Sequence, residues 1–313
     1  MLLAVDIGNT QTVLGLFKGA HLYHTWRLAS DTARTSDELK AIVTQLFYEA
    51  SKEQRFSLDT GHPNEHTARH SARQTTEAIA NPHAAPAIEQ VIVASVVPAL
   101  TQVWTTLIES LSYIKPNTTP LVVDAGVAAQ YSAHTSNPAE IGADRIANAV
   151  AACKLYAAPA IVLDFGTATN IDVVDNDGNY SGGIISPGLQ TSATALFNSA
   201  ARLPALDLEV PEKVLGTTTK TAVQSGLLYG EAAKVSALIK ALQDEDQQFA
   251  RSGVPIIATG GLAPLLVPLI AAVTHSDEHL TLRGLQLIAA DAVIDRTDRA
   301  EKDDGDNREA VHV

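Results

Sequence analysis

Two short stretches repeat one arrangement of a carboxylate, a glycine and small polar residues at the end of an apolar run. The first is "VDIGNT", which contains Asp6, and the second is "LDFGTAT" at 163–169, which contains Asp164. The glycine in each lets the backbone turn tightly and approach a bulky anion, and the N–H groups that follow can line an anion site. Because a carboxylate repels phosphate, the two aspartates indicate a cation between the carboxylate and the phosphate oxygens.

A third turn, "ATGG" at 258–261, also follows an apolar run and contains paired glycines. Such a turn suits close approach of the backbone to a flat base or a ribose. A single Asp-Gly turn is typical of any hairpin. Two of them about 158 residues apart, together with a Gly-Gly turn, are far more specific. The three turns predict a nucleotide clamp.

The stretch "EIGADRIAN" at 140–148 places Asp144 beside Arg145 where a loop meets an alanine-rich helix. Phosphoryl transfer needs positioning, charge neutralisation and one group near the attacking hydroxyl. A carboxylate next to an arginine, with Gly142 leaving room, supplies such a group. Two simpler interpretations stay open. Asp144 could be an acid favoured by the helix dipole, and Arg145 could form an ion pair with Glu140 or Asp144.

Apolar periodicity and turn residues predict the elements that position these groups. Two strands at 2–7 and 12–17 form a hairpin, and a helix at 35–50 begins with Ser36 or Asp37 as its cap. Further strands are expected at 90–100, 120–126, in three pieces within 160–189, and at the start of 254–266. Further helices are expected at 100–112, within 138–156, and at 189–201, 219–243 and 282–294.

The alternation of strands and helices predicts an α/β fold. The repeat of the Asp-Gly arrangement at half the chain length suggests two similar domains that face each other across a cleft. We place them at 1–118 and 119–296. The polar segment 51–87 is interpreted as a variable insertion, and the charged tail 297–313 as disordered.

Histidines cluster in the expected insertion, and the chain has one cysteine, Cys153. His62, His66 and His70 have the spacing of one helical face, so a zinc site is conceivable. Pro63 disfavours a helix there, and a solvated insertion is the preferred interpretation. Cys153 is expected to be a small core residue.

The totals limit the partners and the compartment. The 313 residues carry 22 Lys and Arg against 35 Asp and Glu, a net charge of −13, which argues against nucleic acid or an anionic membrane as the main partner. One cysteine excludes an intramolecular disulfide and fits a reducing compartment. The apolar start is interpreted as a strand rather than a signal peptide, and no apolar run reaches the roughly 18–20 residues of a membrane span. A cytoplasmic protein is expected.

A wider set of motifs resembles one family. The order of the two Asp-Gly turns and the Gly-Gly turn is similar to that of the actin-like ATPase superfamily, which includes acetate and sugar kinases. Within it, the chain resembles type III pantothenate kinase from residue 1 to about 295, apart from 51–87. The most specific motifs are "GADR" at 142–145 and "DFGTAT" at 164–169. The others are "DIGNT", "RTSDE", "SVVPALT", "GGIISPGL", "TAVQSG" and "ATGGLA".

The resemblance implies two actin-like (ribonuclease H-like) domains with mixed sheets flanked by helices and an active site in the interdomain cleft. It implies ATP-dependent phosphorylation of pantothenate to 4′-phosphopantothenate, the first step of coenzyme A synthesis. The implied cofactors are ATP, Mg²⁺ and a monovalent cation, K⁺ or NH₄⁺. The implied assembly is a homodimer.

The resemblance also implies roles for individual residues. Asp144 corresponds to the general base, and Gly142, Ala143 and Arg145 to substrate-binding neighbours. Asp164 corresponds to the monovalent-cation ligand. Thr219 corresponds to a substrate contact that reaches the partner subunit's site, although it could equally be a helix N-cap. The ATP-binding positions are Asp6, Ile7, Gly8, Asn9, Thr10, Gln11, Thr12, Val13 and Thr167, with Asp6 also a candidate for Mg²⁺ bound through the phosphates.

The sequence departs from the family pattern beside the substrate. Thr135 stands seven residues before Gly142, where the family usually has a substrate-contacting Tyr, and Tyr131 could be displaced into that role. Asn170 and Thr218 are milder departures. Two alternatives therefore stay open: a kinase of another small alcohol or sugar on the same fold, or an idle nucleotide-binding regulatory protein. Retention of Asp144 and Arg145 argues against the second, because a mere clamp needs no base.

Overall fold

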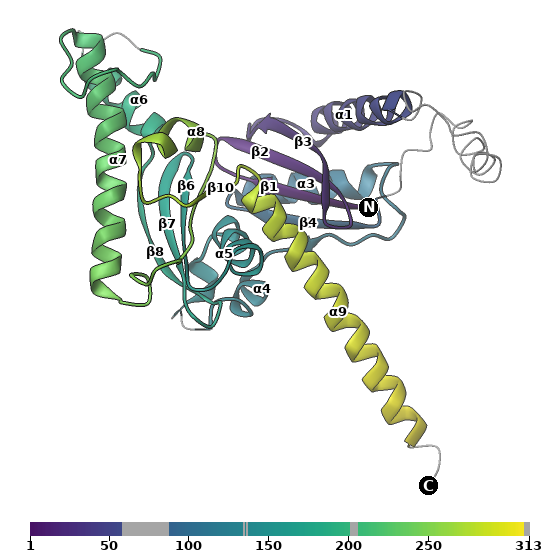
Figure 1. Cartoon of the computed structure of the whole chain (residues 1–313). Helices are drawn as coiled ribbons and strands as arrows, with labels where there is room; N and C mark the ends of the chain where they lie inside the picture. Colours follow the sequence, from purple (N-terminus) through teal and green to yellow (C-terminus); the bar gives the residue numbers. More distant parts are fainter. Residues whose placement is uncertain (58–87, 134, 136, 201–205, 310–313) are drawn as a thin grey trace, which may run out of the picture. The chain divides into compact units, whose positions relative to one another are not determined.

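The computed structural model describes residues 1–57, 88–133, 135, 137–200 and 206–309. The chain forms two compact units, unit 1 at Met1–Val122 and unit 2 at Val123–Val313, a division a few residues beyond the expected one. Each unit contains one five-stranded mixed sheet with helices (Figure 1). The two units are described separately below.

The sheet of unit 1 has the strand order β3-β2-β1-β4-β5. Its first strand, β1, pairs antiparallel with β2 and parallel with β4, and β2 pairs antiparallel with β3. The predicted hairpin is thus confirmed. The strand β3 was not predicted. It has no continuous apolar run, and its only signal is the alternation of half-buried and exposed residues. The bounds are β1 Leu2–Ile7, β2 Gln11–Lys18, β3 His21–Ala29, β4 Gln90–Ser95 and β5 Leu121–Val122.

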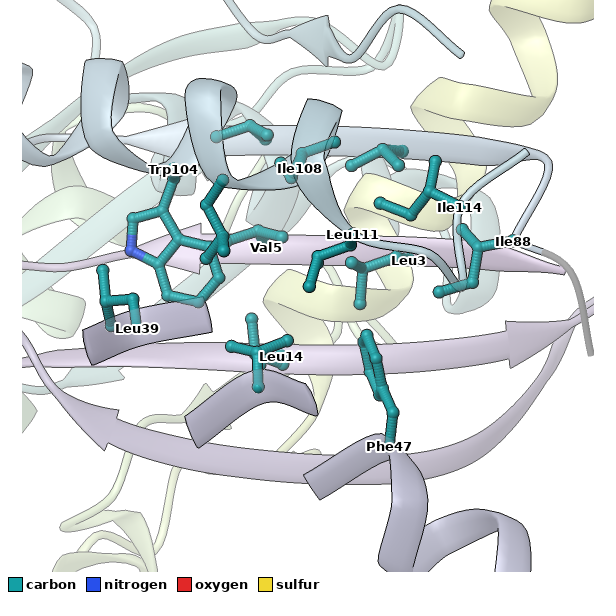
Figure 2. Packing of buried hydrophobic residues seen from close by; sticks show 14 of the residues in the cluster. Leu3, Val5, Leu14, Leu39, Phe47, Ile88, Trp104, Ile108, Leu111 and Ile114 are labelled. Carbon is teal, nitrogen blue, oxygen red and sulfur yellow. The ribbon is translucent and has the colours of Figure 1, made fainter. Parts of the chain in front are cut away.

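Two helices, α1 (Ser36–Ser57) and α3 (Pro98–Ser110), pack with this sheet around the core of unit 1. Figure 2 shows Trp104 and Ile108 of α3 close to Val5 and Leu14 of the hairpin. Full burial of side chains of this size contributes roughly 1.5–3 kcal/mol each. This core fixes the ends of β1 and β2 and therefore the turn between them.

The start of α1 corrects the predicted cap. Thr35, and not Ser36 or Asp37, makes the reciprocal bonds: its Oγ1 accepts from the Glu38 N–H, while a Glu38 carboxylate oxygen accepts from the Thr35 N–H at 2.8 Å. This is a capping box, in which residues three apart satisfy each other's backbone. The Thr-x-x-Glu pattern of this cap is present in the sequence at 35–38.

The sheet of unit 2 has the order β10-β9-β6-β7-β8. β6 pairs antiparallel with β7 and parallel with β9, and β7 pairs antiparallel with β8. The order and directions therefore match those of unit 1 strand for strand, which confirms the internal repeat. The bounds are β6 Ala160–Phe165, β7 Ala168–Val174, β8 Tyr180–Pro187, β9 Ile256–Thr259 and β10 His275–Ser276.

Helices cover this sheet (Figure 1). One face of β6 and β7 packs with α7 in an apolar core that includes Leu163, Phe165 and Ile171, while α5 contacts β6 and β7 and also packs on α9. The bounds of the helices are α4 Ala125–Ala129, η1 Pro138–Glu140, α5 Ala143–Leu155, α6 Leu189–Ser199, α7 Thr219–Glu245, α8 Ala263–Leu266, η2 Val267–Leu269 and α9 Leu280–Glu309.

Two predicted segments are corrected in and beside unit 2. The strand expected at 120–126 covers two residues only, because Asp124 accepts the N–H groups of Gly126 and Val127 and so caps α4. The tail expected to be disordered from 297 is helical to Glu309. Extending an existing helix avoids the cost of nucleation, so a polar sequence can continue α9. Residues 310–313 lie outside the described part.

The first part of the predicted insertion 51–87 is corrected, because residues 51–57 continue α1 to Ser57. Residues 58–87 lie outside the described part of the chain. The predictions for His62, His66 and His70 lie there as well. Among the helices that the structure describes, none combines the length and apolar character required to cross a bilayer.

Candidate active site

The turn of unit 1 joins β1 to β2. Asp6 pairs with Val13 on β2 and with Ala94 on β4, one residue before the end of β1. The Gly8 N–H donates to the Gln11 carbonyl at 3.0 Å, and a Cβ on Gly8 would lie 3.0 Å from that oxygen. The next three residues, Asn9, Thr10 and Gln11, are exposed. The turn is thus tight and presents its backbone to solvent, as an anion site requires.

Two of the expected ATP-binding residues point into the protein instead. Ile7 is fully buried in the core of unit 1. Thr12 is also buried, and its hydroxyl bonds to Ser30 Oγ at 2.9 Å. Contacts from these two positions to a nucleotide would therefore be made by the backbone.

The turn of unit 2 joins β6 to β7. Here the Gly166 N–H donates to the Ala168 carbonyl at 3.0 Å, and Thr167 is exposed. A Cβ on Gly188, at the start of α6, would lie 2.5 Å from the Gly166 carbonyl oxygen. Thr191 Oγ1 donates to the Thr167 carbonyl at 2.6 Å. The first turn of α6 therefore holds this turn in place.

The Gly-Gly turn lies directly against the end of β6. Gly260 has φ +90°, and a Cβ there would lie 2.6 Å from both Asp164 Oδ1 and the Phe165 carbonyl oxygen. The Leu262 N–H donates to the same Phe165 oxygen at 3.2 Å. Only glycine fits this position, because the left-handed φ and the close approach both exclude a side chain. The second and third predicted turns are therefore neighbours in unit 2.

One face of the second sheet carries buried polar groups. Because side chains alternate along a strand, Asp164, Asn170 and Asp172 share the face opposite to the apolar core. Helix α5 contributes two partners: Asn148 Nδ2 donates to Asp164 Oδ2 at 3.3 Å, and Arg145 Nε donates to Asp172 Oδ1 at 2.7 Å. We call Asp144, Arg145, Asp164 and Asp172 the α5 cluster.

Asp144 is the second residue of α5, whose N-cap is Gly142. Its Oδ1 accepts the Arg145 N–H at 2.8 Å, and the side chain is half-buried. Burial raises the pKa of Asp144, and the hydrogen bond and charge of Arg145 oppose that rise. The helix-dipole interpretation fits this position too, but it does not explain why further acids gather beside it.

The other acids of the α5 cluster have strongly raised pKa values. Burial, followed by the charges of Asp144 and Asp172, raises the pKa of Asp164 to about 7, although the Asn148 hydrogen bond opposes it. Burial raises the pKa of Asp172 to about 6, against the charge and hydrogen bond of Arg145. Three carboxylates and one guanidinium leave an excess of negative charge, so the cluster favours a bound proton or cation.

The cluster fits a cation only in part. Among the described residues, no group of three or more His, Cys, Asp or Glu side chains has the arrangement of a metal site. A cation beside Asp164 would therefore need further oxygen ligands from phosphate, backbone or water, which hard cations readily accept. The side-chain amide oxygen of Asn170, Oδ1, lies on the same sheet face. It is buried, lacks a hydrogen-bond partner among the described residues, and could serve as a further ligand.

Arg145 has a partner that sequence analysis missed. It pairs with Asp172, 27 residues further along the chain, and not with Glu140, which accepts from Asn137 Nδ2 at 2.8 Å. The available signal was an acid inside the otherwise apolar strand "IDVV". A buried acid of this kind requires a partner.

The expected substrate residues outside α5 are placed as follows. Thr135 Oγ1 donates to the Ser132 carbonyl at 2.9 Å. The Tyr131 hydroxyl donates to Asp291 of α9 at 2.8 Å, so this side chain is held by α9. Thr219 begins α7 and is exposed, but the N-cap is Thr218, in a capping box with Thr221. The N-cap interpretation of Thr219 is therefore wrong.

Cys153 lies on α5 at a half-buried position, close to the backbone of Gly178, where a Cβ would lie 2.7 Å from Sγ. Burial raises the pKa of its thiol. The raised pKa leaves little reactive thiolate, but Cys153 is half-buried and is not the core residue that was predicted.

The duplicated sheet, with an Asp-Gly turn after the first strand of each copy, defines a protein of the actin-like ATPase and sugar kinase class. Comparison with known proteins agrees. The family model of type III pantothenate kinase matches residues 2–58 and 52–241. The chain belongs to the type III pantothenate kinase family and is therefore a phosphotransferase.

Individual relatives cover almost the whole chain. The type III pantothenate kinase of Moorella thermoacetica is 38% identical over 92% of this chain and 98% of its own. The type III pantothenate kinase of Paramagnetospirillum magneticum is 41% identical over 91% of this chain and 95% of its own. Among solved structures, a Baf-family protein of Campylobacter jejuni is 17% identical, with a TM-score of 0.50 over 93% of this chain and 98% of its own, which supports the fold alone.

Proposed function

We propose that this chain transfers the γ-phosphoryl group of ATP to the primary hydroxyl of pantothenate, forming 4′-phosphopantothenate at the entry to coenzyme A synthesis. The observation that carries the proposal is the α5 cluster. In a chain of this kinase family, the cluster brings together Asp144, whose pKa is raised, Arg145, and Asp164 of the second Asp-Gly turn.

Asp144 is proposed as the general base. As the hydroxyl oxygen attacks the γ-phosphorus, the bond to the β,γ-bridging oxygen breaks and the hydroxyl proton passes to the Asp144 carboxylate, leaving ADP. A raised pKa makes a carboxylate a stronger base. The Arg145 N–H that bonds Asp144 Oδ1 fixes the orientation of the carboxylate.

Arg145 is proposed to bind pantothenate together with the backbone at Gly142 and Ala143. Its Nη2 is buried and lies 2.6 Å from Asp172 Oδ1, an ion-pair contact that lacks hydrogen-bond geometry. A buried donor in this state favours a ligand that accepts from it. Thr135 is proposed as a weaker substrate contact.

The two Asp-Gly turns are proposed to bind ATP phosphates, through residues 6–13 and through Thr167. Mg²⁺, with Asp6 nearby, would neutralise phosphate charge. Asp164 would hold a monovalent cation, K⁺ or NH₄⁺, with Asn170 and phosphate oxygens as further ligands. Thr219 is proposed to contact substrate in the partner subunit of a homodimer, and the enzyme is proposed to act in the cytoplasm.

The test is ADP release from purified protein with ATP, Mg²⁺ and pantothenate, beside Asp144→Asn. Turnover that requires pantothenate is expected, and it should fall about 10²–10⁴-fold in the variant, the usual contribution of a general base. The matched control is Asp277→Asn, which changes a buried acid outside the α5 cluster that pairs with Arg283 at 3.0 Å. The control should keep its activity.

Other results would redirect the assignment. Turnover with glycerol or a hexose in place of pantothenate would favour the alternative acceptor that the Thr135 departure suggests. ATP binding by folded protein without turnover on any acceptor would contradict the kinase and favour a regulatory role. A thermal melt of each variant establishes that the protein is folded.

A further inference from the structure

The guanidinium of Arg145 is held on three sides by residues of the second sheet. Nε and Nη2 lie 2.7 and 2.6 Å from one oxygen, Oδ1 of Asp172. Asp172 is fully buried in β7. The Tyr180 ring of β8 lies 5.3 Å from Arg145 Cζ, within the range of a cation–π contact.

The third side is formed by the backbone of β8. Gly183 is the register partner of Asp172, and a Cβ on it would lie 2.5 Å from Arg145 Nη2 and 2.6 Å from Asp172 Oδ1. It would also lie 2.5 Å from the Ile171 carbonyl oxygen, which cannot move as a side chain can. The absence of a side chain at 183 therefore makes the space in which the pair lies.

This arrangement fixes a long side chain that otherwise has many rotamers. An exposed arginine loses much of its conformational freedom when it is fixed on a ligand. If the folded protein has already fixed Arg145, substrate binding avoids most of that cost. The first turn of α5 also carries Asp144. The orientation of the Arg145 side chain therefore decides where its positive charge lies relative to the proposed base.

We propose that Asp172 is a positioning residue of the enzyme, which holds Arg145 in the one orientation that binds the acceptor substrate, with Gly183 providing the space. This inference rests on the proposed function of Arg145 and goes beyond it. Asp172 acts through Arg145 and does not contact the substrate.

A simpler explanation is that Asp172 and Arg145 form an ion pair that only stabilises the fold. Removing one partner of a buried pair is destabilising in either case, so a loss of stability does not separate the two. The steady-state parameters do, because a positioning residue affects one substrate. We expect Asp172→Asn to raise the KM for pantothenate at least 10-fold and to leave the KM for ATP within 2-fold.

The experiment is a double-mutant cycle with Arg145→Lys, read as the KM for pantothenate with the full-length protein. If Asp172 acts through Arg145, Asp172→Asn should change this KM less than 2-fold in the Arg145→Lys background, since lysine lacks the planar fork that Asp172 orients. Asp277→Asn is the control for loss of a buried acid–arginine pair and should leave both KM values unchanged.

An unchanged pantothenate KM in folded Asp172→Asn, or effects that simply multiply in the cycle, would overturn the inference. Neither result would contradict the proposed function. Turnover of the wild-type protein with pantothenate tests that function in the same assay. If Asp172→Asn does not fold, Gly183→Ala replaces it, because it displaces the same pair by steric contact. Gly183→Ala should then raise the pantothenate KM selectively, and an unchanged KM would contradict the inference.

Discussion

Asp6 in unit 1 and Asp164 in unit 2 occupy equivalent places in two sheets of the same strand order. Each lies one residue before the end of its strand, pairs antiparallel with the second strand, and pairs parallel with the fourth. Each is followed two residues later by a glycine whose N–H closes the turn at 3.0 Å. The strand frame is therefore the same in both units, while the turn of unit 1 is one residue longer than that of unit 2.

The surroundings of the two aspartates differ. The neighbours of Asp6 across the sheet are Val13 and Ala94, while those of Asp164 are Asn170 and Thr259. Two residues before each aspartate, on the same sheet face, the strand partners also differ. Ala4 pairs with Gly15 in unit 1, and Val162 pairs with the buried Asp172 in unit 2. The repeated frame provides two Asp-Gly turns, each proposed to bind phosphate. Polar residues on one face of the second sheet add the α5 cluster beside the turn of unit 2. The proposed chemistry thus belongs to unit 2.

The sharpest test of this difference compares the two aspartates directly. We expect Asp164→Asn to reduce turnover about 10²-fold, as removal of a preorganised electrostatic contact does, and to abolish activation by K⁺. Asp6→Asn should keep K⁺ activation and raise the Mg²⁺ concentration required for half the maximal rate. Initial rates over K⁺ and Mg²⁺ series measure both effects.

Loss of K⁺ activation in Asp6→Asn, or its retention in Asp164→Asn, would reverse the assignment of the two sites. Choline chloride at the same ionic strength is the control for a general salt effect.

The equivalent glycines of the two turns should also respond differently. A Cβ at Gly8 would lie 3.0 Å from the Gln11 carbonyl, whereas a Cβ at Gly166 has no atom nearer than 3.7 Å. We expect Gly8→Ala to raise the KM for ATP about 10-fold, the effect of roughly 1.4 kcal/mol of lost binding, and Gly166→Ala to change it less than 3-fold. Equal effects would show that the phosphates, and not the turn itself, limit the space at both positions.

The smallest expected effect is a dependence of stability on pH. Asp164 has a pKa of about 7 when folded, against about 3.9 in an unfolded chain. Between these values the folded state holds a proton that the unfolded state has released, so stability falls as pH rises from about 4 to about 7. Asp164→Asn removes this contribution. Relative to wild type, its Tm should therefore rise by at least about 2 °C over that range.

Thermal melts of both proteins from pH 4 to pH 8 in choline buffer measure this difference. Adding K⁺ should reduce it, because a cation beside Asp164 favours the ionised carboxylate. Parallel Tm curves for the two proteins would mean that Asp164 titrates alike in the folded and unfolded states.

Much of the fold could be predicted because its signals are local. The hairpin 2–17, the helices around 143–155 and 219–245 and the Gly-Gly turn after β9 all follow from apolar periodicity and turn residues. The strand β3 was not predicted, although Leu22, Trp26 and Leu28 alternate with exposed residues in the pattern of a half-buried strand. The cap of α1 is Thr35 and not the predicted Ser36 or Asp37, and the cap of α7 is Thr218 and not Thr219, which was one of two open interpretations. Neighbouring Ser, Thr and Asp residues compete for the same role.

The order of residues along the chain is enough to place an acid, a glycine and small polar residues after two strands, to set an acid beside an arginine in "GADR", and to identify the family. The tertiary structure alone decided what these groups contact. Arg145 and Asp172 are 27 residues apart and meet because α5 covers the face of the sheet on which Asp172, Asn170 and Asp164 alternate. Burial then sets the pKa values, since the cost of ionisation depends on surroundings that no local pattern specifies.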